Sequence, residues 1–263
     1  NGLEVGPELT DGEKSLVSMG AYVVVFPDKV YVNTQDVTDC GSLECERTAP
    51  AGSGLALCDE TGTAYSGVTE SAGAPEEPRE GALWLDLSGT EPVLRQYSRE
   101  VWTALEGVCV KVQAAGIGTG FAAGDGVEVS GCSVARLNGE TVLQAADTDW
   151  VAFPGTVAGG AVTETAMKLR RFVPEMDYVV QSGNRLWGCK YGMVDGKPVN
   201  EIYASKLGDC KNWRCFAGLA TDSYAAARGS DGVFTGAVSY LGNPIFFKER
   251  CMERVYASGS GAH

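Results

Sequence analysis

Residues 21–33 read AYVVVF-PDK-VYVN, and this stretch decides the fold class. Two short apolar runs, 21–26 and 30–33, lie on either side of the turn-forming Pro27-Asp28-Lys29. Runs rich in β-branched and aromatic residues that are separated by a short polar turn are typical of a β-hairpin. The stretch therefore predicts two antiparallel strands.

The same pattern returns twice in the C-terminal third, at 178–189 (YVV-QSGN-RLWGC) and at 244–256 (PIFF-KER-CMERVY). In each hairpin an aromatic residue is followed by another one nine positions later, which would place the two rings near each other across the strands. The pairs are Tyr22/Tyr31, Tyr178/Trp187 and Phe247/Tyr256. Recurrence of one hairpin type favours a β-propeller, whereas a non-repeating β-sandwich is the alternative.

The composition agrees with an all-β chain. Glycine supplies 35 of the 263 residues, without a strict period, and glycine is the residue that tight turns use most easily. The hydrophobic fraction of 44% is enough for a packed core. We expect propeller-like antiparallel hairpin repeats, in either a complete or an incomplete set, and little helix.

A different module is expected in the middle of the chain. Four short apolar runs are separated there by Gly-Asp and Asn-Gly turns; the runs are 108–112, 126–131, 140–145 and 150–153. One of these turns, Asn138-Gly139, predicts a type I′ hairpin. We therefore expect three domains. They are 1–105, N-terminal hairpins with long polar loops at 47–80; 106–168, an inserted small β-barrel or sandwich; and 169–263, propeller-like hairpins packing with 1–46.

The net charge of −13 limits the kinds of partner that the chain can bind. The negative electrostatic field of the protein repels phosphate backbones and anionic lipids, so neither nucleic acid nor membrane is expected as a partner. No run approaches the roughly 20 apolar residues of a spanning helix, and the first residues lack the pattern of a signal peptide.

Nine cysteines invite a metal or disulfide interpretation, but their spacing favours neither. The closest pairs, Cys40/Cys45 and Cys210/Cys215, are wider than a C-x₂-C zinc motif. We expect no structural metal and mostly reduced, buried thiols, with Cys40–Cys45 as the first candidate if a disulfide forms.

No catalytic constellation is visible, and we expect neither catalytic residues nor a cofactor. The only histidine is His263, so a Ser or Cys hydrolase lacks its usual base. The glycine-rich run 116–120 has no following Lys-Ser/Thr, and the Gly-Asp turns at 124–126 and 229–232 lack a complete calcium loop. The carboxylates of the C-terminal third stand among turn-forming residues, which favours turn caps; they are Glu201, Asp209, Asp222 and Asp231.

Residues 184–256 carry a resemblance to a known class of proteins. The motifs are NRLWGC at 184–189, NEIYASKLGD at 200–209, TDSY at 221–224, GSDG at 229–232 and FFKE at 246–249. They resemble structural proteins of tailed phages and prophages of Gram-positive gut bacteria. The middle module, with GDGV at 124–127 and LNG at 137–139, is similar to a small β module of phage proteins, and the hairpin from Leu83 to Trp102 is likewise phage-like.

The resemblance implies a virion component of the tail, with propeller-like strands carrying an inserted β module. It implies assembly in the bacterial cytoplasm, partners that are other virion structural proteins or further copies of the chain, and no catalytic residues. Oligomers are expected, because exposed strand edges offer backbone groups that a partner can complete.

Two alternatives stay open, a carbohydrate-active propeller enzyme and a carbohydrate-binding module. The enzyme would need a deep pocket with convergent carboxylates. Partner or glycan contacts would use tryptophan, although each of these residues is more often core; the candidates are Trp84, Trp102, Trp150 and Trp213, with Trp187 as a further one. The segment from Ile202 to Trp213 is similar in layout to a sialidase Asp box, but the order of Gly208 and Asp209 differs, which favours a simple turn cap.

Overall fold

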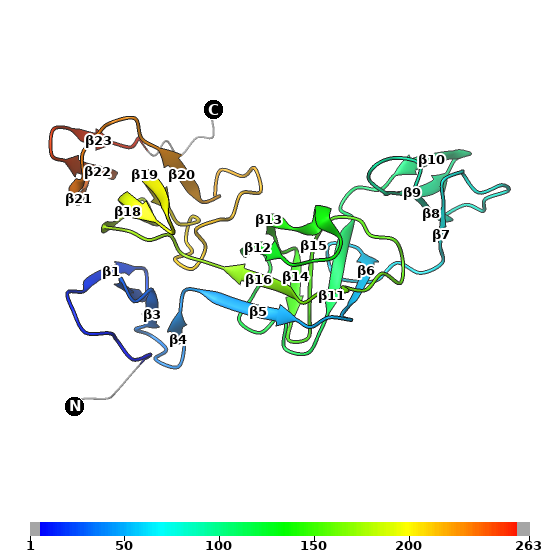
Figure 1. Cartoon of the computed structure of the whole chain (residues 1–263), viewed down its shortest axis with the longest axis horizontal. Helices are drawn as coiled ribbons and strands as arrows, with labels where there is room; N and C mark the ends of the chain where they lie inside the picture. Colours follow the sequence, from blue (N-terminus) through cyan, green and yellow to red (C-terminus); the bar gives the residue numbers. More distant parts are fainter. Residues whose placement is uncertain (1–5, 257–263) are drawn as a thin grey trace. The chain divides into compact units, whose positions relative to one another are not determined.

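Residues 6–256 are described by a computed structural model, and in this range the chain consists of β-strands, connecting turns and one short 3-10 helix at Ala135–Leu137 (Figure 1). The described range contains no α-helix, which confirms the expected all-β class. Two compact units are formed. The first combines the residues up to Cys45 with those from Arg171 onward, and the second is Glu46–Arg170.

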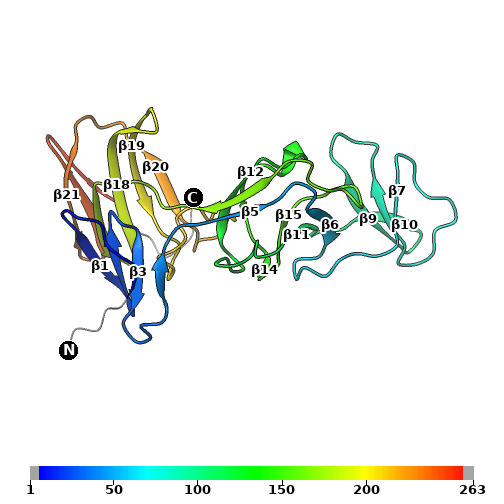
Figure 2. The same ribbon diagram turned by 60° about the horizontal axis from the view of Figure 1, so that its bottom comes forward.

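The first unit contains three antiparallel sheets, each built from consecutive hairpin-connected strands (Figures 1 and 2). The first sheet is β1 (Ser15–Met19), β2 (Tyr22–Phe26), β3 (Val30–Asn33) and β4 (Cys40–Ser42). The second is β17 (Tyr178–Ser182), β18 (Arg185–Val194), β19 (Lys197–Ala204) and β20 (Tyr224–Ala227). The third is β21 (Phe234–Tyr240), β22 (Asn243–Lys248) and β23 (Met252–Arg254).

These three sheets pack in a row. β1 contacts β17 and β18, and β17 in turn contacts β21 and β22, so the first strands of consecutive sheets are neighbours. Small twisted sheets that stack with their first strands together are the arrangement of propeller blades. Because propellers typically have about 4–8 blades, three sheets make an incomplete, propeller-like set.

Alternation of side chains along the strands creates the two cores of this unit. On the first sheet, Val24 and Tyr31 point to the face that packs against Leu186 and Trp213 of the second sheet and its connections. The other core lies between the second and third sheets, where Trp187 and Ile202 contact Phe246. Successive side chains of a strand point to opposite faces, so each sheet can serve two such cores.

The second unit is a two-sheet β-sandwich with an additional sheet. The sandwich sheets have the strand orders β14-β15-β11-β6 and β13-β12-β16-β5, and Val110, Val127 and Leu169 belong to the core they share. Their strands are β5 (Cys45–Ala49), β6 (Gly54–Cys58), β11 (Cys109–Gln113), β12 (Gly126–Ser130), β13 (Gly139–Val142), β14 (Ala145–Asp147), β15 (Trp150–Pro154) and β16 (Met167–Arg171).

The additional sheet lies between β6 and β11 in the sequence. Its strands are β7 (Val68–Ser71), β8 (Leu83–Asp86), β9 (Val93–Ser98) and β10 (Val101–Ala104). β7 pairs with β8 in parallel, and the other pairs are antiparallel. Leu85 and Leu94 belong to the sandwich core, so one face of this sheet is covered by its own unit.

The expectation that 47–80 form long loops is wrong for much of that segment. It contains most of β5, all of β6 and β7, and the side chains of Leu55 and Leu57 on β6 are buried in the sandwich core. The second compact unit begins at Glu46, whereas the expected inserted module begins at residue 106. The unit starts earlier because β6 pairs with β11 along the whole length of both strands. Glycine, serine and threonine around these short strands hide their apolar alternation in the sequence.

The predicted type I′ turn at Asn138-Gly139 is also wrong. Asn138 has a φ of −79°, whereas a type I′ turn needs positive φ at both central residues. The connection from β12 to β13 instead runs through the 3-10 helix. The Asn138 side chain fixes this loop, because its amide donates to the carbonyl of Cys132 (2.9 Å) and its oxygen accepts from the Cys132 amide (2.8 Å).

The predicted hairpins are confirmed, but only one of the three ring pairs is. Tyr22 and Tyr31 lie with their centroids 5.8 Å apart in an edge-on contact. Trp187 instead contacts Tyr224 at 5.8 Å, and Tyr178 lies opposite Cys189. The β22–β23 connection shifts the register so that Met252 lies opposite Phe247.

Candidate interaction surface

The third sheet of the first unit has one buried face. Phe234 and Phe246 point inward with their centroids 6.2 Å apart, and both contact the core formed with Trp187 and Ile202. The strand register places Ala237, Phe246 and Glu253 side by side on this inward face. The intervening residues of all three strands must therefore point outward.

The outward face of this sheet is mostly apolar and exposed, and the register places one charged residue, Arg254, on it beside the half-buried Ile245. In the register, Val238 lies beside Ile245, and Phe247 lies between Gly236 and Met252. The exposed fractions are 42% for Val238, 57% for Tyr240, 39% for Phe247 and 68% for Met252. Leu241 in the β21–β22 turn and Tyr256 after β23 are exposed as well. We call this set the outward face; its members are Val238, Tyr240, Leu241, Ile245, Phe247, Met252 and Tyr256.

In the described part of the chain, β23 forms the outer edge of the third sheet. The Lys248 amide donates to the carbonyl of Cys251, and the Val255 amide donates to the carbonyl of Pro244, so alternate residues of this segment bond to β22. The backbone groups of Met252 and Arg254 then point away from β22. Among the described strands, none pairs with this edge. The first two sheets of the unit have four strands, and this one has three.

A buried lysine holds the sheet in place. The Nζ of Lys248 donates to Oδ1 of Asn200 (2.8 Å) and to the carbonyl oxygen of Ser230 (2.6 Å). Glu253 on β23 forms an ion pair with Arg228 at 2.8 Å and accepts a hydrogen bond from Ser230. These bonds join β22 and β23 to β19 and to the loop before β21, so they fix the position of the third sheet within the first unit.

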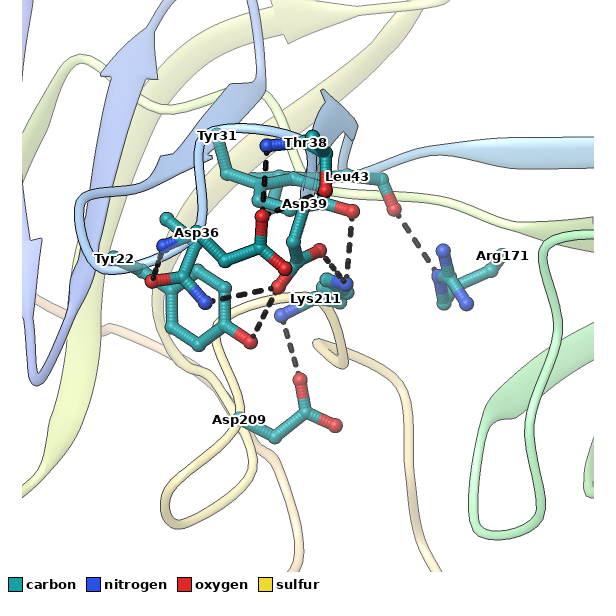
Figure 3. A network of polar contacts seen from close by, with 10 residues as sticks. Tyr22, Tyr31, Asp36, Thr38, Asp39, Leu43, Arg171, Asp209 and Lys211 are labelled. Atoms are coloured by element: carbon teal, nitrogen blue, oxygen red, sulfur yellow. Dashed lines mark hydrogen bonds and ion pairs between the residues drawn. The ribbon is translucent and has the colours of Figure 1, made fainter.

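The residues of the β19–β20 connection are tied to the first sheet through Lys211 (Figure 3). Its Nζ donates to the hydroxyl of Tyr31 (2.9 Å) and lies 3.7 Å from Oδ1 of Asp39. The hydroxyl of Tyr22 donates to Oδ2 of Asp39 at 2.9 Å, and Asn33 donates to the same oxygen at 3.2 Å.

The charges of this cluster stabilise one another. Hydrogen bonds from Asn33 and Tyr22 hold the pKa of Asp39 below its ordinary value. Burial alone would lower the pKa of Lys211, but the hydrogen bond to Tyr31 and the charge of Asp39 outweigh it and raise the pKa. The Lys211 ammonium group and the Asp39 carboxylate therefore stay charged near neutral pH. Their contacts link the β19–β20 connection to the first sheet within the first unit.

Of the candidate tryptophans, the structure brings two together. Trp84 on β8 and Trp102 on β10 lie with their centroids 5.4 Å apart, and Tyr97 lies 5.2 Å from Trp102. Trp84 is buried and its Nε1 donates to the carbonyl of Ser71, whereas Trp102 and Tyr97 are half-buried. Trp102 and Tyr97 are thus the members of this group whose rings are partly exposed to solvent.

The other candidates lie apart from this group. Trp213 is buried against Phe26 and donates to the carbonyl of Cys210, so it cannot contact a partner, and its prediction as a contact residue is wrong. Trp150 is half-buried and lies under the ammonium group of Lys111, 4.0 Å from the ring centroid. Trp187 is buried in the core between the second and third sheets.

A cavity of about 800 Å³ lies where the first strands of the three sheets meet, and Glu13, Asp177 and Tyr178 are among its lining residues. Asp177 is engaged by its own sheet, because Lys190 donates to it at 2.6 Å and the Tyr191 amide donates at 2.9 Å. Its carboxylate therefore fixes the β17–β18 hairpin.

The carboxylates expected to cap turns mostly do so. Asp209 accepts from the Lys211 amide, Asp222 from the Gly218 and Leu219 amides, and Asp231 from the Gly232 amide. Glu201 differs, because it lies on β19 and interacts with Tyr203.

None of the described segments forms a helix that is long and apolar enough to cross a bilayer. Within residues 6–256, no three His, Cys, Asp or Glu side chains converge as a metal ion requires. His263 lies outside the described residues.

The outward face was missed by the sequence-based reasoning, which concentrated on tryptophan. The signal in the sequence was the continuous apolar run Ile245-Phe246-Phe247, with Met252 close behind it. Successive residues of a strand point to opposite faces, so such a run places apolar side chains on both faces of the sheet. No protein-family model matches this sequence, and a search of curated proteins also gives no match.

Proposed function

We propose that this chain is a structural protein of a tailed phage or prophage particle, a component of its tail, and that it works by protein–protein contact. The observation that carries the contact function is the outward face of the third sheet together with the open edge of β23. Contiguous exposed apolar patches are uncommon on monomeric proteins and mark interaction sites. The resemblance of residues 184–256 to phage structural proteins supports the assignment to a particle.

In this proposal the partner binds by adding a strand to the outer edge of β23. A partner strand pairs with the backbone groups of Met252 and Arg254, and its sheet places apolar side chains on Phe247 and Met252. The partner is another virion structural protein or a second copy of this chain. Within the first unit, sheets already pack face to face twice, and the outward face continues that row.

Rigidity supports this role. The outward face is held from behind by Phe246 and laterally by the hydrogen bonds of Lys248, so little conformational freedom is lost when a partner binds. Surfaces that are ordered before binding retain more of their interaction energy as affinity.

Mass spectrometry of purified particles tests the particle assignment. Phage particles, or particles from an induced lysogen that carries the gene, are purified by density gradient and their proteins are identified. We expect the chain in constant ratio to the other tail proteins across the gradient. Particles that are complete and infective without the chain would overturn the assignment.

A pair of variants tests the contact surface. Phe247→Ser with Met252→Ser removes apolar area from the outward face without entering the core. We expect the chain to be lost from particles, while Val101→Ser, which changes an exposed apolar residue on β10, leaves incorporation unchanged. Equal incorporation of both variants would show that the outward face makes no contact.

Glycan binding is a second candidate, favoured by one observation. Trp102 and Tyr97 form a half-buried aromatic pair on the face of the β7–β10 sheet, and sugars stack on such rings. Binding on a glycan array that is lost in Trp102→Ala would support it. The absence of any binding by the unaltered chain would remove it.

A further inference from the structure

Two cysteines lie directly opposite each other in the second unit. Cys58 ends β6 and Cys109 begins β11, and the antiparallel register pairs them. Both side chains are fully buried and belong to one small cluster with Ala152. Directly opposite residues of an antiparallel pair have Cβ atoms about 4.5–5.5 Å apart, on the same face of the sheet. The two cysteine side chains therefore leave the sheet next to each other on the same face.

A covalent bond between them fits the general geometry of disulfides. Disulfides span Cα separations of about 4.4–6.8 Å, which includes the separations of opposite residues in antiparallel strands. Leu57 directs its carbonyl to Tyr65 and not to β11, so Cys58 and Cys109 form a hydrogen-bonded pair with the wider Cβ separation. Their Cβ atoms need to approach by about 1 Å to reach the roughly 3.5–4.5 Å of a disulfide. The Cys109 thiol now donates to the carbonyl of Gly107 at 3.6 Å, so it needs to rotate toward Cys58.

A short turn covers the pair. Residues 59–63 connect Cys58 to the segment that bridges back onto it at Ala64. Lys111 donates to the carbonyl of Gly62 at 3.0 Å, and a Cβ on Gly62 would meet the ring of Trp150. The turn thus lies against the sheet face that carries Cys58, Cys109 and Trp150.

We propose that Cys58 and Cys109 form a cross-strand dithiol that a small disulfide, such as oxidised glutathione, converts into a disulfide bond. Burial raises the pKa of Cys58 to about 12 and that of Cys109 to about 11, so the closed fold keeps both thiols protonated and unreactive. Reaction takes place when the 59–63 turn opens, because the thiolate is the attacking species.

The exchange balances in two steps. One protein thiolate attacks oxidised glutathione, which forms a mixed disulfide and releases one glutathione thiolate. The second protein thiolate attacks the protein sulfur of the mixed disulfide, which forms the Cys58–Cys109 bond and releases the second glutathione. Two protein thiols are oxidised, one glutathione disulfide is reduced, and the two protons pass to the released glutathiones.

The bond would close a large loop. Residues 59–108 carry the whole β7–β10 sheet, so the disulfide joins the two points at which this segment leaves and re-enters the sandwich. Cross-links that close long loops restrict the unfolded chain most. We expect the oxidised protein to melt several degrees above the reduced protein.

Peptide mapping tests the bond directly. The purified chain is incubated with oxidised or reduced glutathione, its free thiols are alkylated in denaturant, and tryptic fragments are analysed by mass spectrometry. Cleavage places Cys58 in fragment 48–79 and Cys109 in fragment 100–111. We expect these two fragments to be linked after oxidation and separate after reduction. Oxidation that leaves them separate, or links either one to another cysteine instead, would overturn the proposal.

Variants separate the bond from general effects of oxidation. Cys109→Ser should abolish the linked fragment and the rise in melting temperature. Cys189→Ala is the matched control, because Cys189 is equally buried but lies opposite Tyr178 and Ile202, and it should keep both. If Cys109→Ser does not fold, the peptide mapping of the unaltered chain still shows whether the Cys58–Cys109 bond forms. A rise in melting temperature without the linked fragment would contradict the proposal.

Discussion

Phe246 and Phe247 are neighbours on β22, yet they belong to different surfaces: Phe246 is 0% exposed and Phe247 is 39% exposed. Phe246 packs with Phe234 and Trp187 in a core, whereas Phe247 lies between Gly236 and Met252 on the outward face. The strand thus separates a residue that holds the fold together from a residue that is available for contact.

Truncating the two rings should have very different effects on stability. We expect Phe246→Ala to lower the free energy of unfolding by about 3–5 kcal/mol, because it leaves a cavity in a packed core. Phe247→Ala should change it by about 0.5 kcal/mol or less, as is usual at exposed positions. Urea denaturation of the two variants measures this, and a similar cost for both would mean that Phe247 is part of a core.

Removing the buried ammonium group should also be costly. Lys248→Ala removes the donor to Oδ1 of Asn200, at a cost of about 1–3 kcal/mol for the unsatisfied group, whereas the carbonyl of Ser230 keeps its hydrogen bond from Nδ2 of Asn200 (2.7 Å). Lys168→Ala is the control, because Lys168 pairs with Glu46 at an exposed site, where about 1 kcal/mol or less is expected. Equal losses in urea denaturation would argue against a role for Lys248 in fixing the third sheet.

Acid should weaken the first unit through Asp28. Lys14 forms an ion pair with this carboxylate at 2.6 Å and the Thr10 amide donates to it at 2.9 Å, and together they hold its pKa at about 2. Because the pKa in the folded state lies below the ordinary value of 3.8, the contribution is complete above about pH 4 and is lost as the pH falls toward 2. We expect Asp28→Asn to be less stable than the unaltered chain at pH 7, with the difference vanishing near pH 2. Denaturation curves at several pH values measure this, and a difference that grows in acid would contradict the sign.

Thiol labelling should distinguish one cysteine from the rest. Cys251 is exposed, whereas burial raises the pKa of Cys189 and Cys210 to about 12 each. At pH 8, Ellman's reagent should therefore react fastest with Cys251, and Cys251→Ser should remove the fast phase. If that phase persists in the variant, a thiol placed in the interior must be accessible.

Local patterns carried most of the fold prediction. The hairpins at 21–33, 178–189 and 244–256 follow from apolar runs around short turns, and strands form there. β6 was missed because only Leu55 and Leu57 mark it among small residues. Its burial comes from pairing with β11, which is distant in the sequence, and no local pattern reports that pairing.

The sites were harder to predict than the strands. Trp213 resembled a contact residue by type, but tertiary packing against Phe26 buries it. In the run from Ile245 to Phe247 every residue is apolar, so the sequence does not reveal which face is inside. The register with β21 and β23 decides this, and it also depends on the bulge between Phe234 and Gly236.

Hydrogen exchange at β23 tests the central claim most directly. The amides of Met252 and Arg254 point away from β22, so in the isolated chain they should exchange rapidly. In purified particles that contain the chain, a partner strand should slow both amides by at least about tenfold, since a bonded amide exchanges only when the contact opens. Amides that exchange as fast in the particle as in the isolated chain would contradict the claim that this edge and the outward face beside it are the contact surface.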